Sequence, residues 1–227
     1  MTEELLKKGT LAKDAAFKLV TTKSEIKNAA LEKIADALIK NSAEILAANK
    51  TDIENAEKKG TRKAMIDRLT LTDARIADMA EGVRQVAALD DPIGKIIDEW
   101  ERPNGLKIAK KRVPIGVIGI IYEARPNVTV DAAVLCLKSS NAVILRGGSD
   151  AISSNKAIMK IMQDAAYSAG IPEGSMNIVE DTSRATATEL MKMNGYIDLL
   201  IPRGSAGLIR SVVENATVPV IETGAGN

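Results

Sequence analysis

The sequence predicts an α/β fold with a doubly wound, Rossmann-like parallel sheet, an N-terminal helical layer and a protruding β-hairpin. Three observations predict it. About ninety N-terminal residues have helical apolar spacing, a short stretch alternates like a strand around an Asn-Gly pair, and the C-terminal half alternates apolar runs with amphipathic segments. Short apolar runs separated by helices are typical of parallel strands that are buried on both faces.

The N-terminal region is predicted to form the helical layer. Its apolar residues recur at the spacing of one helix face, as at Ile26, Ala30, Ile34 and Leu38. Thr22 or Ser24 is the expected cap of that helix. A further helix is expected after Thr72, and the turn-forming residues 90–92 should end it.

Residues 95–112 are predicted to form the protruding hairpin. Two half-polar, strand-like stretches meet at Asn104 and Gly105, a dipeptide that favours a tight type I′ turn. The hairpin either caps the sheet at the surface or pairs by its edge in an oligomer, and the sequence leaves both open.

Beyond Pro114 the sequence predicts five strand–helix repeats. Parallel strands that are joined through helices cross over right-handedly, so we expect one doubly wound sheet. The expected elements are strand 115–121, helix 127–139, strand 142–145, helix 151–168, strand 177–179, helix 183–193, strand 197–201, helix 204–215 and strand 219–222.

Composition excludes several classes of function. The 227 residues include 31 Lys and Arg against 30 Asp and Glu, so the chain has no global positive field for nucleic acid or an anionic membrane. Aromatic residues make up 2%, too few for a platform that stacks single-stranded nucleic acid. No apolar run reaches the roughly 18 residues of a membrane helix and no signal peptide is recognisable, so we expect a cytoplasmic protein.

Histidine is absent, and Cys136 is the only cysteine. These facts exclude Ser-His-Asp and Cys-His nucleophiles, an internal disulfide and nearly every common zinc site, so no metal is expected. Cys136 lies within the expected helix 127–139, where we expect a packed core thiol rather than a nucleophile. A site for a small molecule is the remaining expectation.

Arg146, Gly147, Gly148 and Ser149 follow the carboxyl end of an expected strand, where open parallel sheets bind ligands. The glycines let the backbone approach a ligand, Arg146 can pair with a phosphate, and Ser149 can bind a ligand oxygen. The alternative is an ordinary turn in which Ser149 or Asp150 caps the next helix. A strand-end cation suits the 2′-phosphate of an adenosine ribose, so we favour a cofactor site.

A second glycine-rich loop, residues 202–207, opens the expected helix 204–215. Gly204, Ser205 and Gly207 are small where a pyrophosphate would contact the backbone, although the loop is not G-x-G-x-x-G. Tight packing of the helix start explains the glycines equally well. Together with residues 146–149, the loop favours a cofactor site.

The loop after the first parallel strand contains Arg125, Pro126 and Asn127. Asn127 either caps the following helix or donates its amide to an oxyanion. Arg125 is positioned to hold an anionic substrate.

Residues 113–151, 197–213 and 218–227 resemble the γ-glutamyl phosphate reductase family, within the aldehyde dehydrogenase superfamily, and the resemblance covers essentially the whole chain. It implies NADPH-dependent reduction of L-glutamyl 5-phosphate to glutamate 5-semialdehyde in proline biosynthesis, with release of phosphate. It also implies an aldehyde dehydrogenase-like fold in which residues 1–94 and 113–227 form the NADPH-binding domain.

The resemblance implies roles for individual residues. Asn127 matches an oxyanion-hole asparagine, and Arg146 through Ser149 match the strand end that meets the adenosine ribose. Glu222 matches a glutamate near the nicotinamide, although capping of a neighbouring turn is an equal alternative. The residues that match the pyrophosphate loop are Gly204, Ser205 and Gly207.

In this family a cysteine of a second domain, downstream of a Glu-Thr-Gly element, attacks the acyl phosphate. The chain ends at Asn227 without a matching cysteine, so we expect an inactive cofactor-binding part of a longer enzyme. Residues 95–112 match the superfamily's oligomerisation arm, and glutamate 5-kinase is a candidate partner. Two alternatives stay open: a stand-alone nucleotide-binding or assembly module, and a related acyl-phosphate or acyl-thioester reductase.

Overall fold

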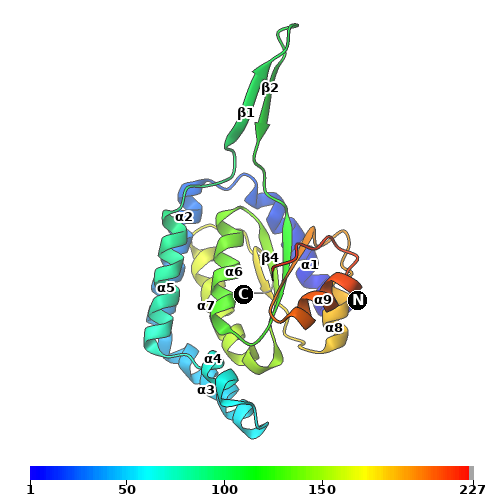
Figure 1. Ribbon diagram of the computed structural model, residues 1–227. Helices are drawn as coiled ribbons and strands as arrows, with labels where there is room; N and C mark the ends of the chain where they lie inside the picture. The colour runs from blue at the N-terminus through cyan, green and yellow to red at the C-terminus, as the bar shows by residue number, and fades with distance from the viewer. Residues whose placement is uncertain (225–227) are drawn as a thin grey trace.

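The computed structural model describes residues 1–224: a parallel sheet lies between helices, and a two-stranded hairpin projects from it (Figure 1). The sheet contains β3 (Val117–Tyr122), β4 (Ala142–Arg146), β5 (Met176–Ile178) and β6 (Leu199–Arg203). These strands are parallel and lie in the order β5-β4-β3-β6. A doubly wound sheet has this order around its first strand, and the predicted fold class is confirmed.

The strand expected at residues 219–222 is reduced to a single bridge. Val220 pairs with Leu200 in parallel, since Leu200 N donates to the Pro219 carbonyl at 2.8 Å and Ile221 N donates to the Leu200 carbonyl at 3.0 Å. Proline has no N–H to donate, so the ladder does not extend through Pro219. Val220 still occupies the place beside β6 where a fifth strand was expected.

Helices form the predicted N-terminal layer and the connections between strands. Helices α6 and α7 pack against one face of the sheet with α2 and α5 outside them, whereas α1 lies against the opposite face (Figure 1). Within residues 1–224, no helix is long and apolar enough to cross a membrane. The bounds are α1 Glu3–Leu19, α2 Ser24–Lys40, α3 Ser42–Lys58, α4 Lys63–Leu69, α5 Asp73–Ala88, α6 Pro126–Lys138, α7 Ile152–Ser168, α8 Arg184–Leu190 and α9 Ala206–Asn215, with a 3₁₀ turn η1 at Ser149–Ala151.

The predicted helix caps are correct for α5 and wrong for α2. Thr72 accepts a hydrogen bond from Arg75 N and caps α5 as expected. Helix α2 instead begins at Ser24, whose hydroxyl donates to Asp91 Oδ2 at 2.5 Å, and Lys23 holds the cap position. Ser24 is therefore bound by Asp91 in the turn after α5, a contact that local sequence does not reveal.

The hairpin consists of β1 (Ile96–Glu101) and β2 (Lys107–Lys111), which pair antiparallel and project from the body of the protein (Figure 1). Its turn is not the expected type I′, because that turn needs positive φ at both central residues. Only Gly105 has a positive φ here, and Gly105 N donates to the Arg102 carbonyl at 2.8 Å. Pro103 fixes a negative φ inside this turn.

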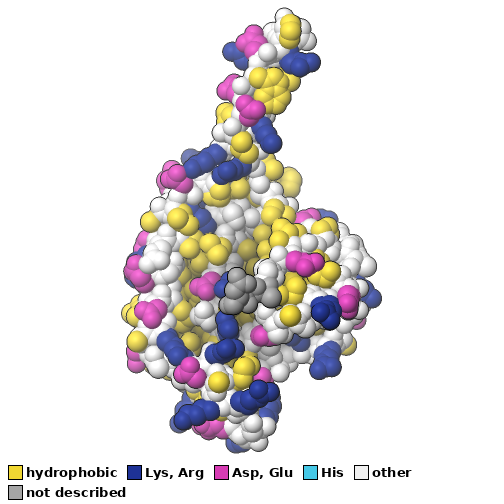
Figure 2. All heavy atoms as spheres, in the orientation of Figure 1, with side chains coloured by type: hydrophobic (Ala, Val, Ile, Leu, Met, Phe, Trp, Pro, Cys, Tyr) yellow, Lys and Arg dark blue, Asp and Glu magenta, His cyan; other side chains and the backbone are white. Residues whose placement is uncertain are grey.

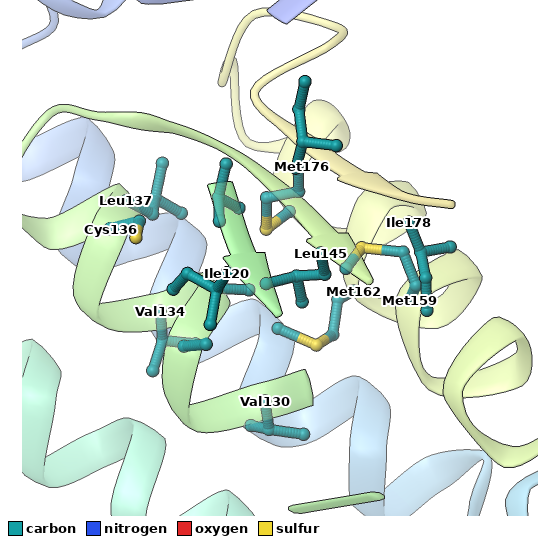
Figure 3. Packing of buried hydrophobic residues seen from close by; sticks show 14 of the residues in the cluster. Ile120, Val130, Val134, Cys136, Leu137, Leu145, Met159, Met162, Met176 and Ile178 are labelled. Carbon is teal, nitrogen blue, oxygen red and sulfur yellow. The ribbon is translucent and has the colours of Figure 1, made fainter. Parts of the chain in front are cut away.

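The main core lies between the sheet and its helices. Ile120 of β3 and Leu145 of β4 face Val134 of α6 and Met162 of α7 (Figure 3). Cys136 is buried in the same core, and burial raises the pKa of its thiol to about 12. The predicted core role of Cys136 is confirmed.

Candidate functional site

Most residues of the predicted site lie at the carboxyl edge of the sheet. The strand order changes between β3 and β6, and open α/β sheets bind ligands in the crevice beside such a change. The described residues form three adjoining hollows here, of about 600, 580 and 420 Å³. We call them the strand-end hollow beyond β4, the switch-point hollow between β3 and β6, and the α5–α6 hollow. Arg68 lines all three.

Five of the predicted cofactor residues line the strand-end or the switch-point hollow. Arg146, Gly148 and Ser149 line the strand-end hollow together with Ser205, although Ser205 comes from another strand end. Gly204 and Ser205 also line the switch-point hollow. The two glycine-containing loops therefore meet in space, as the sequence predicted.

Arg146 has a partly occupied guanidinium. One terminal nitrogen donates to the carbonyls of Thr182 and Ser183, the second at 3.2 Å. Its Nε is buried and has no hydrogen-bond partner among the described residues. Burial lowers the pKa of Arg146 from its ordinary value, and the charge of Asp181 opposes this effect. An unpaired buried donor costs free energy, so this nitrogen favours an acceptor that the described residues do not supply.

Gly147 lies beneath the strand-end hollow rather than in its wall. A Cβ at this position would lie 2.4 Å from Asn155 Nδ2 and 3.0 Å from the Tyr122 ring. Tyr122 and Thr129 hydroxyls lie 2.6 Å apart, and Thr129 donates to Asn155 Oδ1 at 2.9 Å. Asn155 Nδ2 is buried without a partner in the described part of the chain. Gly147 is thus required because its backbone packs closely on the hydrogen-bonded side chains of Tyr122, Thr129 and Asn155.

Helix α7 is capped from another helix. Asp52 of α3 accepts hydrogen bonds from Ser153 N at 3.1 Å and from Ser154 N at 2.7 Å. The alternative in which Ser149 or Asp150 caps this helix is wrong, because Asp52 already occupies its N-terminus. Ser149 is exposed in η1 at the rim of the strand-end hollow.

Glu123 occupies the N-terminal end of α9. Its Oε1 accepts hydrogen bonds from Ser205 N at 3.0 Å and from Ser205 Oγ at 2.6 Å. A Cβ at position 204 would lie 2.8 Å from the Glu123 carboxyl carbon, so Gly204 allows this approach. Gly207 lies in the exposed first turn of α9. A helix N-terminus favours anions, and here a carboxylate of the chain itself occupies it.

Arg125 and Asn127 lie at the start of α6. Arg125 is the N-cap residue and Pro126 is the first helical residue, so Asn127 is inside the helix and the expected Asn127 cap is wrong. Asn127 is exposed, and its Nδ2 donates to Asp131 Oδ2 at 3.4 Å. Arg125 makes no side-chain hydrogen bond or ion pair within residues 1–224 and lines both the switch-point and the α5–α6 hollows. The structure therefore brings Arg125 and Asn127 together.

The short helix α4 holds Arg68 where the three hollows meet. Buried Asn49 brackets the residue after α4, because its Nδ2 donates to the Leu69 carbonyl at 2.9 Å and its Oδ1 accepts from Leu71 N at 2.8 Å. Asn49 Nδ2 also donates to Ser154 Oγ at 3.0 Å, which joins α3 to α7. Arg75 donates to the carbonyls of Asp67 and Thr70, both at 2.5 Å.

Glu222 is exposed and follows the bridge at Val220. The neighbouring Thr223 hydroxyl donates to the Pro202 carbonyl at 2.7 Å, and Thr223 lines the switch-point hollow. Within residues 1–224, the Glu222 side chain makes no hydrogen bond or ion pair, and Glu222 is not among the residues that line the three hollows. Residues 225–227, the end of the third matching stretch, lie outside the described residues.

Sequence reasoning missed four residues of this edge: Glu123, Asp131, Asn155 and Arg68. Glu123 and Asp131 lie within residues 113–151, but nothing local indicates that Glu123 binds the start of a distant helix and that Asp131 lines a hollow. The position of Arg68 depends on contacts of Asn49 with residues about twenty positions away. No local signal in the sequence singles out Arg68.

Comparison with known proteins shows the family of this chain and solved structures with a similar fold. Residues 8–227 match the aldehyde dehydrogenase family. The chain is 59% identical over 225 residues to a γ-glutamyl phosphate reductase of Clostridium botulinum, and the match covers 99% of this chain and 54% of that protein. It is 60% identical over 224 residues to the reductase of Heliobacterium modesticaldum, with the same coverage. The chain spans about half the length of the curated relatives it matches.

Two solved structures are similar over the same extent. The crystal structure of γ-glutamyl phosphate reductase from Thermotoga maritima has a TM-score of 0.97 and 48% identity, covering 99% of this chain and 54% of that chain. The enzyme from Saccharomyces cerevisiae has a TM-score of 0.90 and 32% identity, covering 100% of this chain and 57% of that chain.

Proposed function

The chain belongs to the aldehyde dehydrogenase family, and from this premise we propose that it is the NADPH-binding part of a γ-glutamyl phosphate reductase. That enzyme would reduce L-glutamyl 5-phosphate to glutamate 5-semialdehyde and release phosphate. The names of the relatives support the substrate. The observation that carries the cofactor is Arg146, which lines the strand-end hollow and has a buried Nε without a partner among the described residues.

The residues of the edge fit a dinucleotide phosphate. Arg146 would pair with the 2′-phosphate, because it is a cation at a strand end and its Nη1 makes no hydrogen bond within residues 1–224. Ser149 would bind the ribose, and the backbone of Gly204, Ser205 and Gly207 would face the pyrophosphate at the start of α9. Gly147 supports this wall from beneath through Asn155. Bound NADPH supplies the hydride, and we propose that Glu222 lies near its nicotinamide.

The reacting group would lie beside the start of α6. The Asn127 amide is exposed and would donate to the oxyanion that forms as the carbonyl is attacked. Arg125 would pair with the acyl phosphate and stabilise the leaving phosphate. The only cysteine, Cys136, is buried with a raised thiol pKa, so a thiol nucleophile has to come from outside these residues. We therefore expect the 227-residue chain alone to be inactive.

The hairpin would serve as an oligomerisation arm. Both edges of β1 and β2 beyond their own pairing are exposed, and Ile97 and Trp100 are 53% and 42% exposed. Figure 2 shows hydrophobic side chains along this projection. An isolated two-stranded hairpin is marginally stable in water, which favours a covering partner. We propose cytoplasmic location and contact with glutamate 5-kinase as the remaining features of this assignment.

The cofactor assignment is tested by calorimetric titration of the chain with NADPH and NADH. We expect tighter binding of NADPH, and we expect Arg146→Ala to reduce that preference by about tenfold or more. Arg184→Ala is the matched control, since Arg184 lines the same hollow and should leave the preference within about threefold. An unchanged preference in the Arg146 variant would refute its role.

The activity is tested by mixing the chain with a separately produced C-terminal half of the Thermotoga maritima enzyme. We expect NADPH-dependent turnover of glutamyl phosphate only in the mixture. Turnover by the 227-residue chain alone would overturn the predicted inactivity. A mixture that stays inactive although the two halves associate would count against the reductase assignment.

A further inference from the structure

Helix α6 leaves one stripe of side chains uncovered. Asn127, Asp131 and Leu135 are exposed or half-buried, whereas every other residue of the helix is buried. Because these positions are four residues apart, they lie one above the other on a single helix face. Asn127 and Asp131 line the α5–α6 hollow. The stripe therefore runs from the sheet edge into that hollow.

Asp131 is a half-buried carboxylate with little to balance its charge. Its hydrogen bond from Asn127 is long, at 3.4 Å, and it forms no ion pair with residues 1–224. By contrast, Asp52 accepts three hydrogen bonds and Asp91 pairs with Lys27 at 2.5 Å. Burial raises the pKa of Asp131, and the charge of Arg203 offsets only part of this effect. A cation bound beside Asp131 would stabilise its ionised form.

We propose that Asp131 binds the α-ammonium group of the substrate and thereby selects an acyl phosphate derived from an α-amino acid. The inference rests on the proposed function, in which the reacting carbonyl lies at Asn127. One helical turn separates Asn127 from Asp131, a rise of about 6 Å. An extended glutamyl chain spans about 5 Å from its side-chain carbonyl carbon to its α-nitrogen. The two distances match.

The opposite wall of the α5–α6 hollow suits the rest of such a substrate. Leu71 and Met79 are buried apolar residues that can contact the methylene groups. Arg68 and Arg125 line the hollow and have no side-chain partner among residues 1–224, so they can pair with the carboxylate and the phosphate. Arg75 is occupied by two carbonyls of α4 and its end. The hollow of about 420 Å³ lies within the range of small-molecule sites.

The test uses the ¹⁵N-labelled chain and two commercial probes, L-glutamate and glutarate, in amide chemical-shift titrations. Glutarate lacks the ammonium group and has one more negative charge, so attraction to arginine alone favours glutarate. We expect the wild-type chain to bind L-glutamate about tenfold more tightly than glutarate, with shifts in residues 127–135. Asp131→Asn should abolish the preference for L-glutamate or reverse it in favour of glutarate.

Two controls keep the result specific. Asp78→Asn removes an exposed carboxylate from the other wall of the same hollow and should leave the ratio unchanged. A titration with 2′,5′-ADP reports folding and tests the cofactor site separately, through shifts in residues 146–149, and Asp131→Asn should preserve it. If 2′,5′-ADP causes no such shifts in the wild-type chain, the cofactor proposal is contradicted, whereas the comparison of L-glutamate with glutarate still tests the role of Asp131.

Three outcomes would overturn the inference. The first is that the wild-type chain has no preference for L-glutamate over glutarate. The second is that Asp131→Asn keeps the preference. The third is that Asp78→Asn lowers the preference as much as Asp131→Asn does. The first outcome is measured on the wild-type chain alone, so the proposal can be refuted even if a variant misfolds.

Discussion

Glu123 and Ser205 are joined by two hydrogen bonds that place a carboxylate at the N-terminus of α9. The proposed pyrophosphate position is the same helix end, so the carboxylate and the cofactor compete for it. We expect Glu123→Gln to bind NADPH about three- to tenfold more tightly, because a neutral amide repels the pyrophosphate less. Calorimetry measures the change, and Glu214→Gln, an exposed residue of the same helix, is the control. Weaker NADPH binding in the variant would mean that Glu123 supports the cofactor instead.

The Asp52 cap predicts a large stability effect at a position without a catalytic role. Asp52→Ala removes acceptors from Ser153 N, Ser154 N and Ser154 Oγ, all in a buried region. We expect a loss of about 2 to 4 kcal/mol in the free energy of unfolding, measured by urea denaturation. Asp150→Ala should cost less than about 0.5 kcal/mol, since Asp150 makes only a surface ion pair with Lys59. Equal losses of stability in the two variants would mean that Asp150 caps α7 as much as Asp52 does.

We expect Asp131→Asn to raise the free energy of unfolding by an amount that depends on pH. Its pKa is raised in the folded chain, so the folded state binds more protons than the unfolded state in that range. Wild-type stability therefore falls as pH rises from the ordinary aspartate pKa, about 3.9, through the raised value. Asp131→Asn avoids this fall. Because the carboxylate is half exposed, its advantage at pH 7 should be below about 1 kcal/mol.

Denaturation of both chains between pH 4 and pH 8 checks this prediction. The advantage of Asp131→Asn should be smallest at the acid end and reach a plateau above the raised pKa. An advantage that grows toward acid pH would have the wrong sign for a carboxyl with a raised pKa.

Removal of the hairpin should leave the body of the protein intact. Every residue of β1, and all of β2 except the half-buried Ile108, is exposed. We expect a short linker in place of residues 96–111 to change the melting temperature by less than about 3 °C and to abolish self-association. Calorimetry and analytical ultracentrifugation measure the two effects. A variant that self-associates like the wild type would refute the oligomerisation role.

Cys136 should be unreactive in the folded chain. The residue is 5% exposed and the pKa of its thiol is raised to about 12, so little thiolate is present at neutral pH. We expect labelling by a disulfide reagent at pH 7.5 to be at least about 100-fold slower in buffer than in 8 M urea. Fast labelling of the folded chain would contradict the packed core position.

The buried strands could be predicted from sequence because burial on both faces leaves a direct signal. Val117–Tyr122 is apolar except for one glycine and is buried throughout. The turn of the hairpin was mispredicted although the signal was local. Asn104 and Gly105 favour type I′, but Pro103 before them restricts φ to negative values and makes the turn start one residue earlier.

The candidate site was only half predictable, for a physical reason. Glycines and arginines at strand ends are visible in sequence, and the fold brings Arg146, Ser149, Gly204 and Ser205 together as expected. The carboxylates that bind the helix N-termini beside these residues come from positions far away in the sequence. Asp52 reaches Ser154 over 102 positions and Glu123 reaches Ser205 over 82, and no local pattern encodes either contact.

Asn49 gives the two sides of the site a common support. Its single side chain binds the backbone on both sides of Thr70 and the hydroxyl of Ser154, so the segment carrying Arg68 and the helix behind the strand-end loop share one attachment. The wall that would face the amino acid therefore cannot shift without straining the wall that would face the nucleotide. Engineering this protein for a longer acyl chain should leave Asn49 untouched and enlarge the hollow at Leu71 or Met79 instead.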